Sequence, residues 1–293
     1  MSKSSRRAGG MALALLLVLA PSIASHAQEE APATGGGFGL SEDDDKPIEI
    51  SAENGIEWKR DARTYTARGN ALALQGDTSI AADTLVAYLD TNDELSSWEA
   101  FGNVKIETGE STSYGDYAKY EETTRVLVLT GSNLKVETEN QTVTARDQLE
   151  YWRDKDIVVA KGNVVIVRPE KNTTIHSDEA TGYFRDKVDD PATEEVESGS
   201  EIYQLEAHGH VRVDREEQTA TANHLAYNPN SDIAVLTGSV VIHSKENVYT
   251  GGRAELDMGR DVSRLLPAEG QRVHTVIKPK KKAETTEGAP VTQ

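Results

Sequence analysis

Apolar residues recur at every second position around six regularly spaced glycines of the chain. Successive glycines lie 33, 29, 31, 47 and 29 residues apart. They are Gly69, Gly102, Gly131, Gly162, Gly209 and Gly238. A period near 30 residues is typical of repeat architectures, in which each repeat is one small supersecondary unit. Alternation with a period of two predicts β-strands that bury one face.

The alternation continues through the glycine in most copies. The residues two and four positions before each glycine are apolar or aromatic, and after Gly102 the same spacing gives Val104 and Ile106. A two-residue hairpin at the glycine would move the inward positions to the third and fifth residues after it. Those residues are mixed in character, as Lys105 and Glu107 show. The pattern therefore predicts one strand that passes through the glycine and bends there.

The copy at Gly131 departs from this alternation, because polar residues occupy the second and fourth positions after it. A local shift of one residue would turn Leu134 and Val136 inward instead. We consider the same shift for Gly69, where it would turn Leu72 and Leu74 inward.

A second segment recurs between the glycines. It begins with a small residue and a polar one, and it mostly ends in an aromatic residue before a turn, as in Ala82–Tyr88. Each repeat is thus predicted to hold two strands, so the chain should contain about 13 to 16 strands. No segment shows a helical period with capping residues. The sequence predicts an all-β fold.

The N-terminal residues have the pattern of an export signal. Basic residues precede an apolar run at 11–20, and Ser25-His26-Ala27 fits a cleavage site. We expect a cleaved signal peptide at residues 1–27 and a flexible acidic leader at 28–46. The β-domain should cover residues 47–277. An acidic loop insertion is expected at 188–200 and a disordered tail at 278–293.

Composition narrows the possible functions. Removal of residues 1–27, which hold three basic residues and no acidic one, takes the formal net charge from −18 to −21. Such a charge argues against nucleic acid as a partner. The chain has no cysteine, which excludes thiolate metal sites and cysteine nucleophiles.

Candidate chemistry is sparse along the chain. Motifs of serine hydrolases, zinc proteases and phosphate-binding loops are missing from the sequence. His208 and His210 have the spacing that places two side chains on one face of a strand, but the sequence nominates no third ligand. We interpret both as solvated histidines and predict no metal, no cofactor and no catalytic residue, so the chain should not be an enzyme.

The apolar stripe is the organised feature that remains. It can be a closed structural core, or part of it can stay open as an apolar groove. The first reading favours an exported β-solenoid or polymeric scaffold. An exported β-helix enzyme acting on polysaccharides is a further alternative, because β-helix enzymes use carboxylates on their strands.

The repeated phrase resembles a known family. The pattern (Ala/Thr)-x-Gly-Asn-Val-x-Ile, as at residues 100–106 and 160–166, alternates with Ala-Asp-x-Leu-x-x-Tyr, as at 82–88. Behind a signal peptide and without cysteine, this combination is similar to the OstA-like domain of the LptA family. Members of that family form the periplasmic bridge for lipopolysaccharide transport in Gram-negative bacteria. The resemblance covers about residues 47–266.

The resemblance implies an open antiparallel β-jellyroll of two sheets in a V, with an apolar interior that holds the acyl chains of lipid A. It implies a periplasmic protein that is not an enzyme and needs no cofactor. Such domains stack end to end by strand pairing, as a head-to-tail homo-oligomer or with LptC-like inner-membrane and LptD-like outer-membrane partners. Ile48 and Ile50 would lie near the N-terminal edge, and residues 262–277 near the C-terminal one. By position, the groove would be lined by Val104, Ile106, Leu127, Leu129, Val158, Val164, Ile166, Leu205, Val211, Val213, Leu236, Val240 and Ile242.

Overall fold

A computed structural model describes residues 46–186, 200–245, 247–260, 262–267, 269–270 and 272–277. The predicted signal peptide, nearly all of the acidic leader, the insertion up to residue 199 and the C-terminal tail lie outside the described residues.

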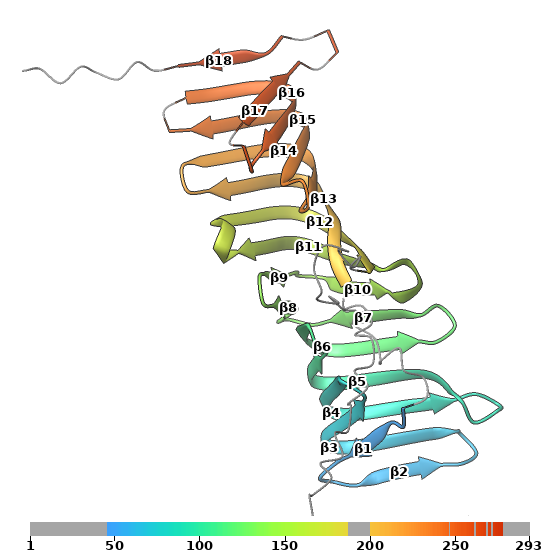
Figure 1. Ribbon diagram of the computed structural model, residues 1–293. Helices are drawn as coiled ribbons and strands as arrows, with labels where there is room; N and C mark the ends of the chain where they lie inside the picture. Colours follow the sequence, from blue (N-terminus) through green and yellow to red (C-terminus); the bar gives the residue numbers. More distant parts are fainter. Residues whose placement is uncertain are drawn as a thin grey trace, which may run out of the picture. The chain divides into compact units, whose positions relative to one another are not determined.

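The described residues form one antiparallel sheet of 18 strands (Figure 1). The strands of the first half are β1 (Glu49–Ser51), β2 (Ile56–Lys59), β3 (Thr64–Gln75), β4 (Thr78–Leu89), β5 (Leu95–Glu107), β6 (Ser111–Glu121), β7 (Val126–Thr130), β8 (Lys135–Thr138) and β9 (Thr142–Thr144). Those of the second half are β10 (Gln148–Trp152), β11 (Ile157–Arg168), β12 (Thr173–Asp186), β13 (Ser200–Arg215), β14 (Gln218–Asn228), β15 (Ile233–Ser244), β16 (Asn247–Asp257), β17 (Val262–Leu266) and β18 (His274–Val276). Two 3-10 helices, η1 (Arg153–Lys155) and η2 (Pro169–Lys171), are the only helices in the described part of the chain. The all-β prediction is confirmed.

Most strands pair with the strands before and after them in the sequence, so the sheet is a continuous ladder. β7 and β8 both pair with β6 and thus act as two halves of one bent strand. The same holds for β9 and β10 on β11, for β1 and β2 on β3, and for β17 and β18 on β16. Counting these four split pairs as single bent strands reduces 18 to 14, within the range predicted from the repeats.

The glycines bend strands that continue through them, as the parity of the apolar residues predicted. β5 runs through Gly102, and Ala100 and Val104 on either side of it are 0% and 2% exposed. Gly102 and Asn103 both have left-handed backbone conformations, with φ of 76° and 48°. The register of β5 against β6 shifts at this point. Two successive left-handed residues turn the strand while the same face stays buried.

A short polar side chain, from a neighbouring strand or from the bend between two half-strands, lies against the glycine of each corner. A Cβ on Gly102 would lie 2.2 Å from Oδ2 of Asp83. The amide of Asn103 donates to both oxygens of that carboxylate, at 3.1 and 3.0 Å. The other corners repeat the arrangement, with Asn54 against Gly69, Asp116 against Gly131, Asp147 against Gly162, Asp178 against Gly209 and Asn223 against Gly238. This contact explains the polar residue near the start of the second recurring segment.

The two copies singled out for a register shift behave differently. At Gly131 the strand breaks between β7 and β8, and Leu134 and Val136 are buried as predicted. At Gly69 the predicted shift is wrong. Ala71 is 0% exposed and Leu74 is 39% exposed, because β3 continues through its glycine with the same bulge as the other copies.

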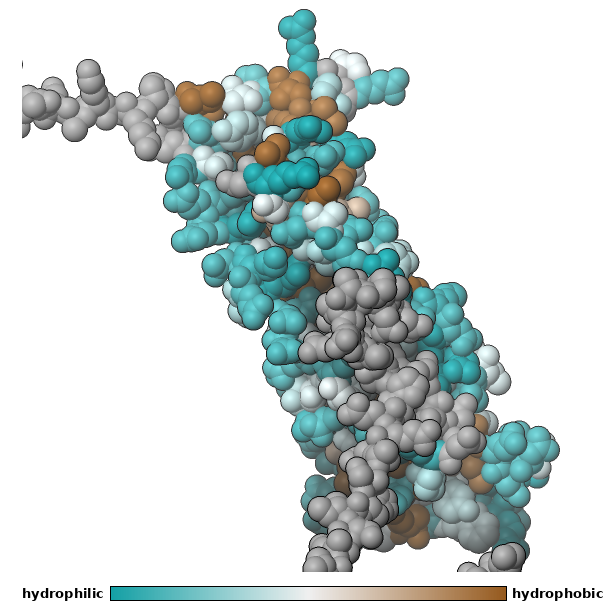
Figure 2. Space-filling model, viewed as in Figure 1, coloured by the Kyte–Doolittle hydropathy of each residue, from teal (hydrophilic) through white to brown (hydrophobic). Residues whose placement is uncertain are grey.

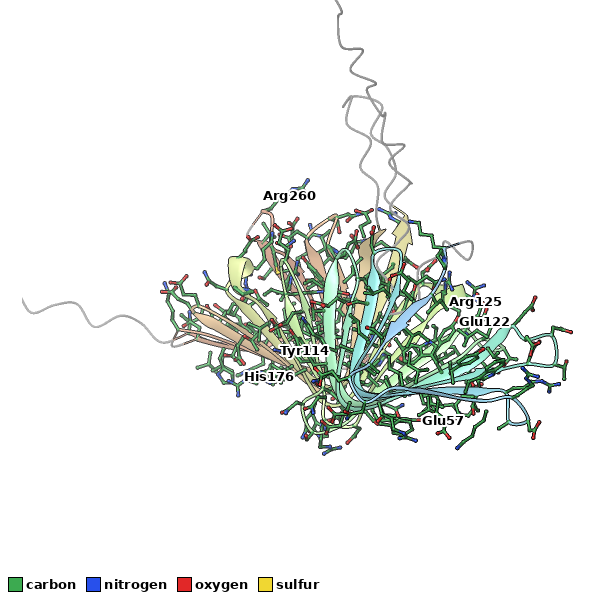
Figure 3. The ribbon with its side chains drawn as sticks, turned by 90° about the horizontal axis from the view of Figure 1, so that it is seen from below. Glu57, Tyr114, Glu122, Arg125, His176 and Arg260 are labelled. Carbon is green, nitrogen blue, oxygen red and sulfur yellow. The ribbon has the colours of Figure 1, made fainter. Side chains whose placement is uncertain are left out.

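The corner divides the sheet into two layers that face each other across the core. Figure 3 shows strands diverging from a shared corner near Tyr114, whereas Glu122 and Arg125 lie at the far end of one layer. Alanines fill the core next to the corner, and Ala160, Ala180 and Ala207 are in register on three strands. Larger side chains lie farther out, where Trp98 and Tyr120 stack with ring centroids 6.1 Å apart. Small residues are needed where the layers converge, because the side chains of both layers share little space there.

The corner carboxylate at Asp116 predicts a pH dependence of stability. Its Oδ2 accepts hydrogen bonds from the backbone N–H of Ser132, at 2.7 Å, and from its hydroxyl, at 2.9 Å. These bonds hold the pKa of Asp116 below its ordinary value. A carboxyl whose pKa is lowered by folding stabilises the fold above its unfolded pKa of about 3.9, and this contribution disappears as the pH falls through the folded pKa. We expect Asp116→Asn to lower the urea midpoint at pH 7 and to leave it nearly unchanged near pH 2. An equal difference at both pH values would contradict this assignment.

Candidate functional site

A cavity of about 400 Å³ opens between the two layers at the N-terminal end of the ladder. β3 contributes Tyr65 from before its corner and Ala73 from after it, and β4 contributes Ile80 and Leu85 in the same way. Both layers therefore line the cavity. Its full lining is Ile48, Ile50, Ile56, Tyr65, Ala67, Ala73, Ile80, Leu85, Val86, Ala87, Leu89, Leu95, Trp98 and Glu99.

Apolar side chains make up most of this lining, and Glu99 is its one charged residue. The Glu99 carboxylate is engaged, since it accepts hydrogen bonds from the hydroxyls of Tyr88, at 2.9 Å, and Tyr117, at 2.8 Å. Burial and the bond to Glu99 raise the pKa of Tyr117 to about 12, so its hydroxyl remains a donor at neutral pH. A cavity of this size and polarity suits an apolar ligand.

The thirteen residues predicted for the groove all lie on the interior face, and twelve of them are less than 10% exposed. Val158 is the exception and is half-buried. Val213 and Leu236 border a second cavity of about 40 Å³ between strands of the C-terminal half. Ile48 and Ile50, predicted for the N-terminal edge, line the large cavity.

Several residues of the large cavity were not predicted from the sequence. Tyr65 and Trp98 lie four positions before Gly69 and Gly102, so the alternation that selected the other interior residues applies to them. Ile80 belongs to β4, a strand without a corner glycine. The Ile80 side chain points inward because Ile80 lies opposite Ile106 in the register of β4 and β5.

Exposed hydrophobic side chains gather at the two ends of the ladder. Figure 2 shows hydrophobic residues at the end that carries β16–β18, while the side of the ladder in that view is mainly hydrophilic. The strands β1, β2, β17 and β18 pair on one side only within the described residues. The exposed large hydrophobic residues in or beside these strands are Ile48, Ile56, Trp58, Val262, Leu266, Val273, Val276 and Ile277. Unpaired strand edges beside apolar side chains can accept another strand.

The two histidines considered from the sequence have different partners. Nδ1 of His210 lies 2.7 Å from a carboxylate oxygen of Asp178 beside the corner. His208 lies next to His224 of β14, with ring centroids 4.4 Å apart, and its Nε2 is 3.5 Å from Glu206. Burial and the neighbouring His208 lower the pKa of His224. His224 was not predicted, because its proximity depends on the pairing of β13 with β14.

No helix among the described residues is long and apolar enough to cross a membrane.

The chain was compared with curated proteins, with solved structures and with protein families. A search of curated proteins returned no match. Among solved structures, the chain is similar to the crystal structure of LptH, the LptA homologous periplasmic component of the conserved lipopolysaccharide transport device from Pseudomonas aeruginosa. That similarity has 13% sequence identity and a TM-score of 0.22, and it covers 80% of this chain and 97% of the other.

The family comparison matches the chain twice, over residues 49–151 and 143–262. The matching family is described as LptA/(LptD N-terminal domain) LPS transport protein. Together the two matches span the strands from β1 to β16 and more than half of the chain. This chain therefore belongs to the family of LptA and LptD N-terminal domain lipopolysaccharide transport proteins.

Proposed function

We propose that this chain is a periplasmic, non-enzymatic bridge that carries lipopolysaccharide from the inner to the outer membrane. The acyl chains of lipid A would lie between the two layers while the sugars stay in water. The observation that carries the proposal is the apolar cavity of about 400 Å³ at an end of the ladder, beside strands with unpaired edges. A lipid entering there meets the interior face that continues along all corner-bearing strands.

Energetics favour transfer along this face. Burial of one CH₂ group contributes about 0.8 kcal/mol, so a chain of a dozen carbons gains roughly 10 kcal/mol when fully buried. A carrier must not hold its cargo that tightly at one place. The repeat supplies similar apolar positions about every 30 residues, which gives successive sites of similar energy. Because the predicted groove residues are already packed, the two layers must separate as the lipid passes.

The ends of the ladder are proposed to join other chains. β2 at the N-terminal end and β17 at the C-terminal end would each add a strand from an LptC-like inner-membrane protein, an LptD-like outer-membrane protein or a second copy of this chain. Strand addition would extend the sheet and its interior face into the next protein.

Photo-crosslinking in cells tests the lipid path. A photoreactive amino acid at Ile80 or Ile166 faces the interior, whereas the same group at the adjacent Ala81 or Val167 faces outward. We expect lipopolysaccharide adducts at the two interior positions, at least about tenfold above the outward controls. Equal yields at interior and outward positions would contradict the path and favour the scaffold alternative. Adducts at Ile80 alone would show that the lipid occupies the N-terminal cavity and does not travel along the rest of the interior face.

A further inference from the structure

We propose that Glu206, His208 and His224 form a binding site for a divalent transition-metal ion of the Zn²⁺ class. The site lies on the outer face of the sheet and is separate from the proposed lipid path. Two imidazoles and one carboxylate are ligands that Zn²⁺ uses in proteins, with water in the remaining position.

The backbone places the two histidines side by side. His208 on β13 and His224 on β14 are directly opposite residues, and the register shifts immediately after them, to Val211 opposite Ala222. Directly opposite residues of antiparallel strands have Cβ atoms about 4.5–5.5 Å apart. Because the corner follows at once, both side chains are held at a fixed point of the ladder. Glu206 lies two positions before His208 on the same face, since Leu205 and Ala207 point inward.

The ligand atoms are close enough to share one ion. One ligand atom from each of the three side chains lies within 4.8 Å of the others. Zn–N and Zn–O distances of about 2.0–2.2 Å place tetrahedral ligand atoms roughly 3.3–3.6 Å apart. Small side-chain rotations at a partly exposed surface bring the three atoms to that separation. Within the described residues, this is the one group of three or more histidine and carboxylate ligands that is so compact.

Neighbouring side chains already orient two of the three ligands. The Glu206 carboxylate accepts hydrogen bonds from Nε2 of Gln204, at 2.6 Å, and from the hydroxyl of Tyr183, at 3.3 Å. The hydroxyl of Thr237 lies 3.4 Å from Nδ1 of His224. Partners of this kind fix the direction of ligands at metal sites. The strongly negative chain also attracts cations.

Titration of the full chain with Zn²⁺ at pH 7.5 tests the site, with any histidine tag removed. Calorimetry should give one ion per chain. His208→Ala and His224→Ala should each weaken binding by more than about 100-fold, since loss of a neighbouring orienting group alone costs about 10–100-fold at known sites. The matched control is His210→Ala, which removes an exposed histidine of the same strand that faces Asp178. This control should bind Zn²⁺ as the unaltered chain does.

The absorption spectrum of bound Co²⁺ provides a second measurement, which reports the metal ligands directly and not the stability of the protein. Its visible absorption should report nitrogen ligands in the unaltered chain and in His210→Ala, and it should be lost in His224→Ala. Circular dichroism of each variant verifies that the sheet is intact. The proposal is overturned if the chain binds no Zn²⁺, if the two cluster variants bind as well as the control, or if the control loses binding equally.

Discussion

Lysine at Val262 and Leu266 is expected to prevent the chain from joining its neighbour at the C-terminal end. Both side chains lie on β17, at the C-terminal end of the ladder, and are 47% and 43% exposed. Charged residues on an edge strand oppose the addition of another strand, because pairing would remove their charge from water. A photoreactive amino acid at Arg264, exposed on the same strand, should capture a neighbouring chain in cells. We expect the double substitution Val262→Lys/Leu266→Lys to reduce that capture at least about tenfold.

The matched control for this experiment is Val167→Lys. Val167 is 38% exposed and lies on β11, in the middle of the ladder, where both edges of the strand are paired. Val167→Lys adds one positive charge at a similarly exposed position, where the double variant adds two, so capture at Arg264 should persist. Both variants should fold, since substitutions at exposed positions usually change stability by less than about 0.5 kcal/mol. Unchanged capture in the double variant would show that β17 is not the joining edge. Mass spectrometry of the captured chain distinguishes an LptC-like protein, an LptD-like protein and a second copy.

Alanine at Gly131 is expected to lower the free energy of unfolding by about 3 kcal/mol or more. Gly131 has φ of 142°, and an added Cβ would lie 2.5 Å from the backbone nitrogen of Asp116. A strained backbone conformation alone costs about 1–3 kcal/mol. The clash adds to this cost, because a backbone atom cannot rotate away as a side-chain end can. Domains of this kind are stable by only about 5–15 kcal/mol, so the variant should unfold at clearly lower denaturant concentration.

Two other glycines separate the causes of this effect. Gly55 has φ of 93° but no atom within 4 Å of an added Cβ, so Gly55→Ala should show the cost of the conformation alone. Gly109 has open space around an added Cβ and no left-handed backbone conformation. Gly109→Ala should therefore leave the free energy of unfolding nearly unchanged. Urea unfolding followed by circular dichroism measures all three. If Gly131→Ala lowers the free energy of unfolding no more than Gly55→Ala does, the clash with Asp116 does not contribute to the effect.

The repeat made much of the fold predictable. The alternation of apolar residues has to match the pleat of a strand, so it indicated both the strands and their buried faces. Because the even positions stay apolar on both sides of Gly102, the sequence also distinguished a bent strand from a hairpin. The same rule predicted the inward turn of Leu134 and Val136. It failed at Gly69, where Leu72 and Leu74 are also apolar and hydrophobicity alone could not choose between Ala71 and its neighbour.

The repeat, the all-β class and the apolar face follow from the sequence alone, because they depend on the spacing of residues within single strands. Features that depend on the pairing of separate strands became visible only in the folded chain. The tertiary structure placed Asp83 and its equivalents over the corner glycines, opened the cavity at the N-terminal end beside the exposed Ile56, and brought His224 next to His208. Contacts between strands depend on register, and the one-residue bulges at the corners set that register in ways that hydrophobic spacing does not specify.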